Sequence, residues 1–287
     1  MTQTNLGWLY GLIGVIIFAG SLPATRIAVV DFSPEFLTFA RASIAGSIAL
    51  LCLLITKQKI PNFQQLKSLI IIILSIIIGF PLFTALALQT ITSAYSTIFI
   101  GILPLFTALF AVFRAHEKPK ALFWLFTLLG TTLIIIFILF HTQDRSFKIG
   151  DIYMILSILV CGLGYAEGGK LSRELGGWQV TCWALTVSFP FMLLFGFYYF
   201  PSNLSIISHT SFIGLLYVSI FSTLIGFFFW YKGLGLGGIA KVGQIQLIQP
   251  FISFIFAAFL LHEKIEFSML IISILVLLCV FMAKKHA

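Results

Sequence analysis

The sequence predicts an all-α membrane protein with ten transmembrane helices, from its composition, the length of its apolar segments and an internal repeat. Hydrophobic residues make up 60 % of the 287 residues and charged residues only 9 %, and the mean hydropathy is +1.11. Soluble globular proteins carry about 25 % charged residues. So sparse a set of charges excludes a soluble enzyme, a disordered chain and a nucleic-acid-binding protein.

The apolar residues fall into segments of the length that a bilayer requires, about 20 residues for one helix. Cutting the sequence at charges, prolines and polar clusters gives ten such segments: 7–26, 34–56, 67–89, 93–114, 120–140, 150–171, 178–199, 211–232, 239–261 and 266–284. The loops left between them are short. We therefore expect a single transmembrane domain over residues 1–287.

The basic residues predict how the chain is oriented. With a cytosolic N-terminus, twelve of the 17 Lys and Arg residues lie at the inner face, four at the outer face, and Arg41 inside a span. Cytosolic loops of membrane proteins carry the excess of Lys and Arg. We therefore expect both termini in the cytosol and the chain in the inner (plasma) membrane of the cell.

An internal repeat relates the two halves of the sequence. The stretch AYSTIFIGILPLFTALFAVFRAHEKPK, from residue 94, aligns without a gap with AKVGQIQLIQPFISFIFAAFLLHEKIE, from residue 240. This alignment pairs Pro104 with Pro250 and Glu117 with Glu263. We expect repeats over 1–141 and 150–287. Each repeat holds five spans, an odd number, so the second enters the membrane inverted, an arrangement characteristic of secondary transporters.

At this point the sequence resembles the drug/metabolite transporter superfamily, in its EamA-type branch of ten-helix transporters. The resemblance covers the whole chain and rests on AGSLPATR (19–26), SPEFLTFAR (33–41), GYAEGGKLSRELGGWQV (164–180) and a proline thirteen residues before a glutamate in helices 4 and 9. The first helix departs from the family pattern, because it reads Phe18-Ala19-Gly20 in place of the common Trp-Gly. The resemblance implies alternating-access transport of small metabolites, in many relatives by export.

The expected function is therefore secondary, non-ATP transport of small metabolites, with export of amino acids or related amphipathic compounds in first place and proton coupling as an added option. Uptake or exchange of organic cations or other metabolites is the alternative, and a passive channel or a membrane-embedded enzyme is more remote. The sequence carries no P-loop, HExxH or GxSxG motif, so we expect no enzyme activity, metal or cofactor. The expected partners are a small-molecule substrate, protons and the lipid bilayer, and we expect no binding of nucleic acid. The protein is expected to be a monomer or a homodimer.

Polar and aromatic residues inside the spans are the candidates for substrate contact. Amides within an apolar span are costly unless they are hydrogen-bonded, so Gln246 and Gln249, on one helix face, bond either another helix or a substrate. Trp230 belongs either to an interfacial aromatic belt or to the wall of a substrate site. The substrate-binding candidates are Thr97, Tyr165, Trp230, Gln246, Gln249 and Arg41.

Two charges at membrane depth each admit a structural and a functional interpretation. Arg41, ~10 Å into its span at 1.5 Å per residue, either reaches outward to Asp31 or Glu35 or holds a substrate carboxylate. Glu167 either pairs with Lys170 on its own helix or serves in proton coupling or cation pairing, the default hypothesis for an intramembrane carboxylate.

The two repeat-related proline–glutamate pairs have a simpler expected role. Pro104 and Pro250 are predicted to break helices 4 and 9, because proline lacks the N–H that a helix interior needs. Glu117 and Glu263 end these helices at opposite faces, where we expect structural capping or gating contacts.

Overall fold

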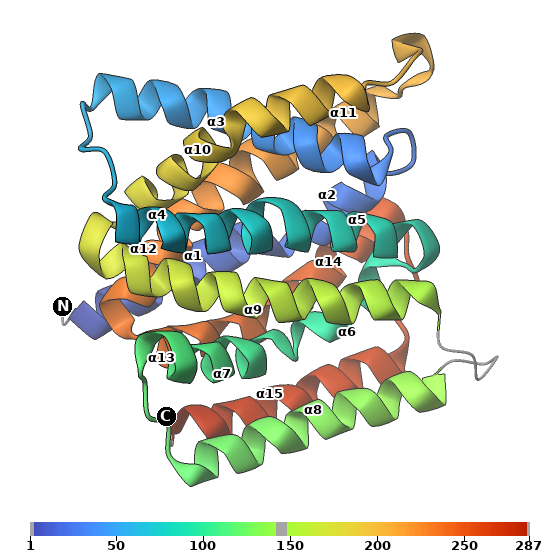
Figure 1. Cartoon of the computed structure of the whole chain (residues 1–287). Coiled ribbons are helices and arrows are strands. Elements are labelled where there is room, and N and C mark those ends of the chain that lie inside the picture. Colours follow the sequence, from blue (N-terminus) through green and yellow to red (C-terminus); the bar gives the residue numbers. More distant parts are fainter. Residues whose placement is uncertain (1–2, 142–147, 286–287) are drawn as a thin grey trace.

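The computed structural model describes residues 3–141 and 148–285, and the regular structure within these ranges is helical throughout (Figure 1). The elements are α1 (Gln3–Ala19), α2 (Ser21–Ala28), α3 (Pro34–Ile55), α4 (Phe63–Ile72), η1 (Ile73–Gly79), α5 (Phe80–Thr90), α6 (Ser93–Ile100), α7 (Leu103–Ala115), α8 (Ala121–His141), α9 (Ile149–Leu175), α10 (Gly177–Tyr198), η2 (Leu204–Ile206), α11 (His209–Leu216), η3 (Tyr217–Gly226), α12 (Phe227–Gly237), α13 (Ile239–Gly243), η4 (Gln244–Ile248), α14 (Gln249–Leu261) and α15 (Phe267–Lys285). The segments η1 and η3 are π-helices, and η2 and η4 are 3₁₀-helices.

Within residues 3–141 and 148–285, eight continuous or nearly continuous helical stretches are long and apolar enough to cross a membrane. They are Gln3–Ala28, Pro34–Ile55, Phe63–Thr90, Ser93–Ala115, Ile149–Leu175, Gly177–Tyr198, His209–Gly237 and Ile239–Leu261. Each falls on one of the predicted segments. The two other predicted segments correspond to α8 and α15, which are apolar and lie side by side along one edge of the molecule, opposite α3 and α10 (Figure 1).

The outer surface of the helix bundle is suited to lipid. Large apolar side chains such as Leu54, Phe113, Phe197 and Phe259 are 63–77 % exposed, more than a soluble monomer tolerates in contiguous patches. Polar side chains lie inside, among them Thr38, Ser96, Ser219 and Gln246. The prediction of an all-helical, multi-pass membrane protein is confirmed.

The first helix packs against α12 through glycines on both sides. A Cβ atom placed on Gly7 would lie 2.7 Å from the backbone nitrogen of Gly237, and one on Gly233 would lie 2.7 Å from that of Gly11. Only glycine allows two backbones to approach so closely, as is common between membrane helices. We call this contact the glycine seam; it fixes α1 against the helix that carries Trp230.

Prolines coincide with three interruptions of the spans. Pro23 follows the break between α1 and α2, Pro104 is the second residue of α7, and Pro250 is the second residue of α14. Proline donates no backbone hydrogen bond and crowds the preceding turn. The sequence therefore places a local break between α1 and α2, before α7 and before α14.

Candidate substrate site

The break in the first helix leaves backbone carbonyls that side chains of other helices satisfy. Pro23 has no N–H for the carbonyl four residues before it, that of Ala19. In hydrocarbon, such freed groups need a partner within the protein. The donors are the Tyr217 hydroxyl to Ile17 at 2.8 Å, the Gln249 amide to Phe18 at 3.5 Å and the Ser253 hydroxyl to Ala19 at 2.8 Å.

An aromatic cluster lies beside this break. The Phe18 ring lies 4.9 Å from that of Phe227 and 6.1 Å from that of Trp230, and Tyr165 lies 5.2 Å from Trp230, between ring centroids. These spacings are those of ordinary aromatic packing. Trp230 has no exposed surface, so it lies in the interior and not in an interfacial belt. Two of the candidate residues, Tyr165 and Trp230, are thus brought together.

Several buried polar atoms around this cluster have no hydrogen-bond partner among the described residues. They include the indole nitrogen of Trp230 and the amide oxygen of Gln249, whereas the Gln246 side chain lies against the Tyr165 hydroxyl. Leaving such a group unpaired costs about 1–3 kcal/mol, and native structures rarely do so without a functional reason. We call these three residues, together with Phe18, Tyr165 and Phe227, the central cluster.

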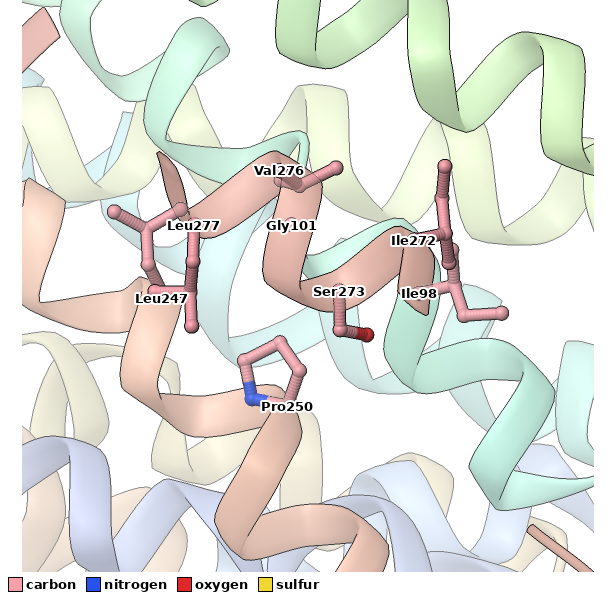
Figure 2. A pocket seen from close by; sticks show the side chains of 8 residues that line it. All are labelled: Ile98, Gly101, Leu247, Pro250, Ile272, Ser273, Val276 and Leu277. Carbon is pink, nitrogen blue, oxygen red and sulfur yellow. The ribbon is translucent and has the colours of Figure 1, made fainter. Parts of the chain in front are cut away.

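A small cavity lies where the breaks before α7 and before α14 meet α15. Figure 2 shows Ser273 of α15 beside the Pro250 ring, and the other lining residues are apolar. The cavity measures about 10 Å³, room for about one water molecule. It cannot hold a metabolite.

Arg41 lies on α3 and is only 4 % exposed. Its Nε donates to the Thr223 hydroxyl at 2.8 Å, and one terminal nitrogen donates to the Ser222 hydroxyl at 3.4 Å. It does not reach Asp31 or Glu35, as the structural interpretation required. Asp31 lies in the loop after α2, where hydrogen bonds from Ser208, and also from Ser211, hold the pKa of its carboxyl below the usual value.

Thr97 is fully buried on α6. Its hydroxyl donates to the carbonyl of Ser93 in its own helix at 2.8 Å. This bond uses the hydroxyl locally, and no ring or hydrogen-bond contact of the described residues joins Thr97 to the central cluster. Its role in substrate binding stays a prediction.

Glu167 has no exposed side-chain surface and pairs with Arg114 on α7, at 2.6 Å between Oε2 and Nε. Its second oxygen accepts from the Ser68 hydroxyl on α4. The partner is therefore a residue of another helix and not Lys170, the nearest basic residue along the sequence. The ion pair and the Ser68 hydrogen bond together join α4, α7 and α9 near one end of the bundle.

Glu117 joins the two halves of the chain at that same end. Its carboxylate accepts from the backbone N–H groups of Ile239 at 3.0 Å and Ala240 at 2.9 Å, and from Arg173 at 2.7 Å. It thereby caps the start of α13. An open depression of about 540 Å³ surrounds it, lined also by Lys118, Arg173 and Lys241.

Glu263 makes the equivalent contact at the opposite end. Its carboxylate accepts from the backbone N–H groups of Ser93 at 3.0 Å and Ala94 at 2.8 Å, and from the Ser93 hydroxyl at 2.9 Å, at the start of α6. The stretches Ser93–Ala115 and Ile239–Leu261 each begin where the other ends, so the two are antiparallel. A depression of about 420 Å³ lies here, lined also by Arg26 and Thr92.

Sequence reasoning missed the partners of the charged residues. It did not connect Arg41 with Ser222 and Thr223, or Glu167 with Arg114. The available signal was the row of hydroxyl residues Ser219, Ser222 and Thr223, whose spacing places them on one helix face. The partner helix was not deducible from that face alone.

These observations define a multi-pass helical membrane protein of the transporter class, with contacts between its halves at both ends and a polar, aromatic interior. The chain belongs to the EamA-like transporter family, whose profile matches residues 5–140 and, a second time, 148–284. It is 51 % identical over 287 residues to the uncharacterized transporter YdeK of Bacillus subtilis, with both chains fully covered.

Two more distant matches also cover nearly the whole chain. An uncharacterized transporter of Archaeoglobus fulgidus is 25 % identical over 281 residues, covering 95 % of this chain and 96 % of its own. A solved structure, described only as a crystal structure of a protein, superposes with a TM-score of 0.72 at 16 % identity, covering 98 % of this chain and 99 % of that one. The likeness to that structure concerns the fold alone.

Proposed function

We propose that the protein is a secondary transporter that exports amino acids or related small amphipathic compounds by alternating access. It would do so with ten spans, α8 and α15 included, arranged as two inverted five-helix repeats over 1–141 and 150–287. The observation that carries the substrate class is the central cluster, because aromatic walls and unpaired amide and indole groups suit a ligand with both an apolar and a hydrogen-bonding part.

The orientation follows from the basic residues. The depression around Glu117 carries three of them, Lys118, Arg173 and Lys241, against Arg26 alone in the depression around Glu263. Cytosolic faces are the basic ones, so we propose that the Glu117 end and both termini face the cytosol. A basic mouth also attracts carboxylate-bearing solutes from that side, which favours export.

Transport of organic cations is the second candidate function. The aromatic rings of Phe18, Tyr165 and Trp230 favour it, since ring faces attract cations. Against it stands Arg41, which brings a positive charge into the interior without an ion pair among the described residues. Amino acids satisfy both features, and we therefore place them first.

Screening of the purified protein by thermal denaturation tests this proposal. A ligand that binds only the folded state raises the apparent melting temperature. Amino acids should raise it, and Gln246→Leu should remove most of that shift, because the substituted side chain can form no hydrogen bond with the ligand. Stabilisation by amines and quaternary ammonium compounds alone would favour the cation alternative.

Glu167 is the candidate for proton coupling, and its contacts bear on that role. The Arg114 ion pair and the Ser68 hydrogen bond use both of its oxygens. Truncating one partner of a buried pair is costly because the other charge is left alone. We propose that Glu167 closes the Glu117 end, and that any proton exchange on Glu167 requires this end to open first.

Glu167→Gln separates the two roles in proteoliposomes. We expect a changed transport rate both with and without an imposed pH gradient, because a closing contact acts in every cycle. The response to the gradient should persist. If the variant loses only the acceleration by the pH gradient, and its transport rate without a gradient equals that of the wild type, Glu167 carries the coupling proton and the closing role is wrong.

A further inference from the structure

Arg41 occupies an unusual place for a charged side chain. It is almost completely buried on α3, and its two hydrogen-bond partners, Ser222 and Thr223, lie on η3. The segment η3 is a π-helix, a local form that is frequent at functional sites. Thr223 accepts from Arg41 while its own hydroxyl donates to the Val218 carbonyl at 2.7 Å, so the partner geometry is fixed by η3 itself.

No negative charge compensates Arg41 within the described residues. Glu35, on the same helix, forms no hydrogen bond or ion pair with Arg41 among the described residues, and two other acids are committed elsewhere, Asp31 to Ser208 and Ser211, and Glu167 to Arg114. A guanidinium offers five N–H donors, and only two have partners here. An unneutralised buried charge is strongly destabilising, which leaves a forked, positively charged donor set in the interior without an acceptor of matching charge.

A hydroxyl chain connects Arg41 to the central cluster. Ser222 also contacts Ser21, at 2.6 Å between the two hydroxyl oxygens. Ser21 opens α2 directly after the break in the first helix, and Phe18, whose ring belongs to the central cluster, lies one turn before it. The two parts of the interior therefore share the broken helix as a common wall.

We propose that Arg41, with Ser21 and Ser222 beside it, is the binding site for a substrate carboxylate. The proposal rests on the proposed function and narrows it to small monocarboxylates, zwitterionic amino acids among them, with the rest of the molecule lying toward the central cluster. A planar guanidinium matches a carboxylate with two parallel hydrogen bonds. The bound carboxylate supplies the missing negative charge.

Titration calorimetry on the full-length purified protein tests the site with three matched probes: L-phenylalanine, 3-phenylpropionate, which lacks the amine, and 2-phenylethylamine, which lacks the carboxylate. The wild type should bind the two carboxylates and not the amine. Arg41→Gln should weaken carboxylate binding by about tenfold or more, as for loss of a charged hydrogen-bond partner. Arg41→Lys keeps a point charge without the forked donors, so its carboxylate affinity should lie between those of the wild type and Arg41→Gln.

A second readout separates binding from a structural role. Without ligand, Arg41→Gln should melt at the same temperature as the wild type or higher, because an uncompensated charge has been removed. A lower melting temperature together with unchanged carboxylate affinity would overturn the proposal. Thr223→Val keeps the charge and removes the acceptor of Nε, so it should weaken carboxylate binding less than Arg41→Gln does.

The probes also distinguish this proposal from the proposed function. Binding of 3-phenylpropionate but not of L-phenylalanine, lost in Arg41→Gln, would refute amino-acid transport and support the site. Equal binding of L-phenylalanine by wild type and Arg41→Gln would refute the site and leave amino-acid transport intact. Absence of carboxylate binding by the wild type would also refute the site. So would a higher melting temperature in sodium chloride than in sodium sulfate that is lost in Arg41→Gln, because chloride would then supply the negative charge beside Arg41.

Discussion

Glu117→Gln should loosen the protein at the Glu117 end, and Glu263→Gln should loosen it at the opposite end. Each carboxylate accepts two backbone N–H groups from the other half of the chain and one further side-chain bond. Glutamine keeps one accepting oxygen and loses the charge. Losing such a contact costs about 1–2 kcal/mol, a factor of about 5–30 in the locally open population.

Hydrogen exchange measured by mass spectrometry reads this effect at both ends in one experiment. In Glu117→Gln, exchange should rise in peptides covering 235–241 and stay equal or fall in peptides covering 88–95. In Glu263→Gln the pattern should reverse, because opening at one end retains the contacts at the other. We expect these opposite signs from alternating access, in which only one end opens at a time.

Glu174→Gln is the matched control at the Glu117 end. Glu174 is exposed, and one of its oxygens accepts from the Gln65 side chain at 3.2 Å, without capping a helix of the other half. Its substitution should change exchange little. Loosening of both ends together in either capping variant would show that the carboxylates stabilise the whole fold without acting as separate closures.

Gly233→Ala should destabilise the protein strongly. Its new Cβ would lie 2.7 Å from the Gly11 nitrogen and 2.9 Å from the Gly7 carbonyl oxygen. Backbone atoms cannot rotate away, so α1 and α12 must separate along the glycine seam. Overpacking of this kind costs about 1–3 kcal/mol, and Gly233→Val should reduce the yield of folded protein further.

The control for the glycine seam is Gly196→Ala on α10. Its Cβ would have Ser43 as its nearest neighbour at 3.7 Å, an ordinary contact. Thermal denaturation of the two alanine variants, followed by the loss of the monodisperse peak in size-exclusion chromatography, should give a clearly lower midpoint for Gly233→Ala. Equal midpoints would mean that the seam has room to relax.

Composition and segment length were sufficient for the fold class, because the number of apolar segments does not depend on how they pack. The proline–glutamate spacing also identified the equivalent ends of α7 and α14. It left the contact itself open, since Glu117 reaches Ile239, 122 residues further along the chain. Local repetition shows which residues are equivalent, whereas the partner across the bundle depends on the tertiary fold.

The charged residues show where sequence reasoning fails. For Glu167 the nearest basic residue along the helix, Lys170, was the obvious partner, yet Arg114, 53 residues away, makes the ion pair. For Arg41 the expected partners were Asp31 and Glu35, near the start of its own helix, whereas hydroxyls of η3 accept its hydrogen bonds. The sequence left open whether Trp230 belongs to an interfacial belt or to the wall of a substrate site, and tertiary packing buries it completely.

Counterflow in proteoliposomes tests most directly whether this chain moves an amino acid by alternate opening of its two ends. Vesicles loaded with a high concentration of an unlabelled amino acid are diluted into a trace of the same compound in labelled form, with no pH gradient or membrane potential. An alternating carrier should accumulate the label transiently above its external concentration, because the unlabelled substrate inside competes for the inward-facing site and the label therefore leaves more slowly than it enters. A monotonic approach to equilibrium without an overshoot would indicate a passive pore and contradict alternating access.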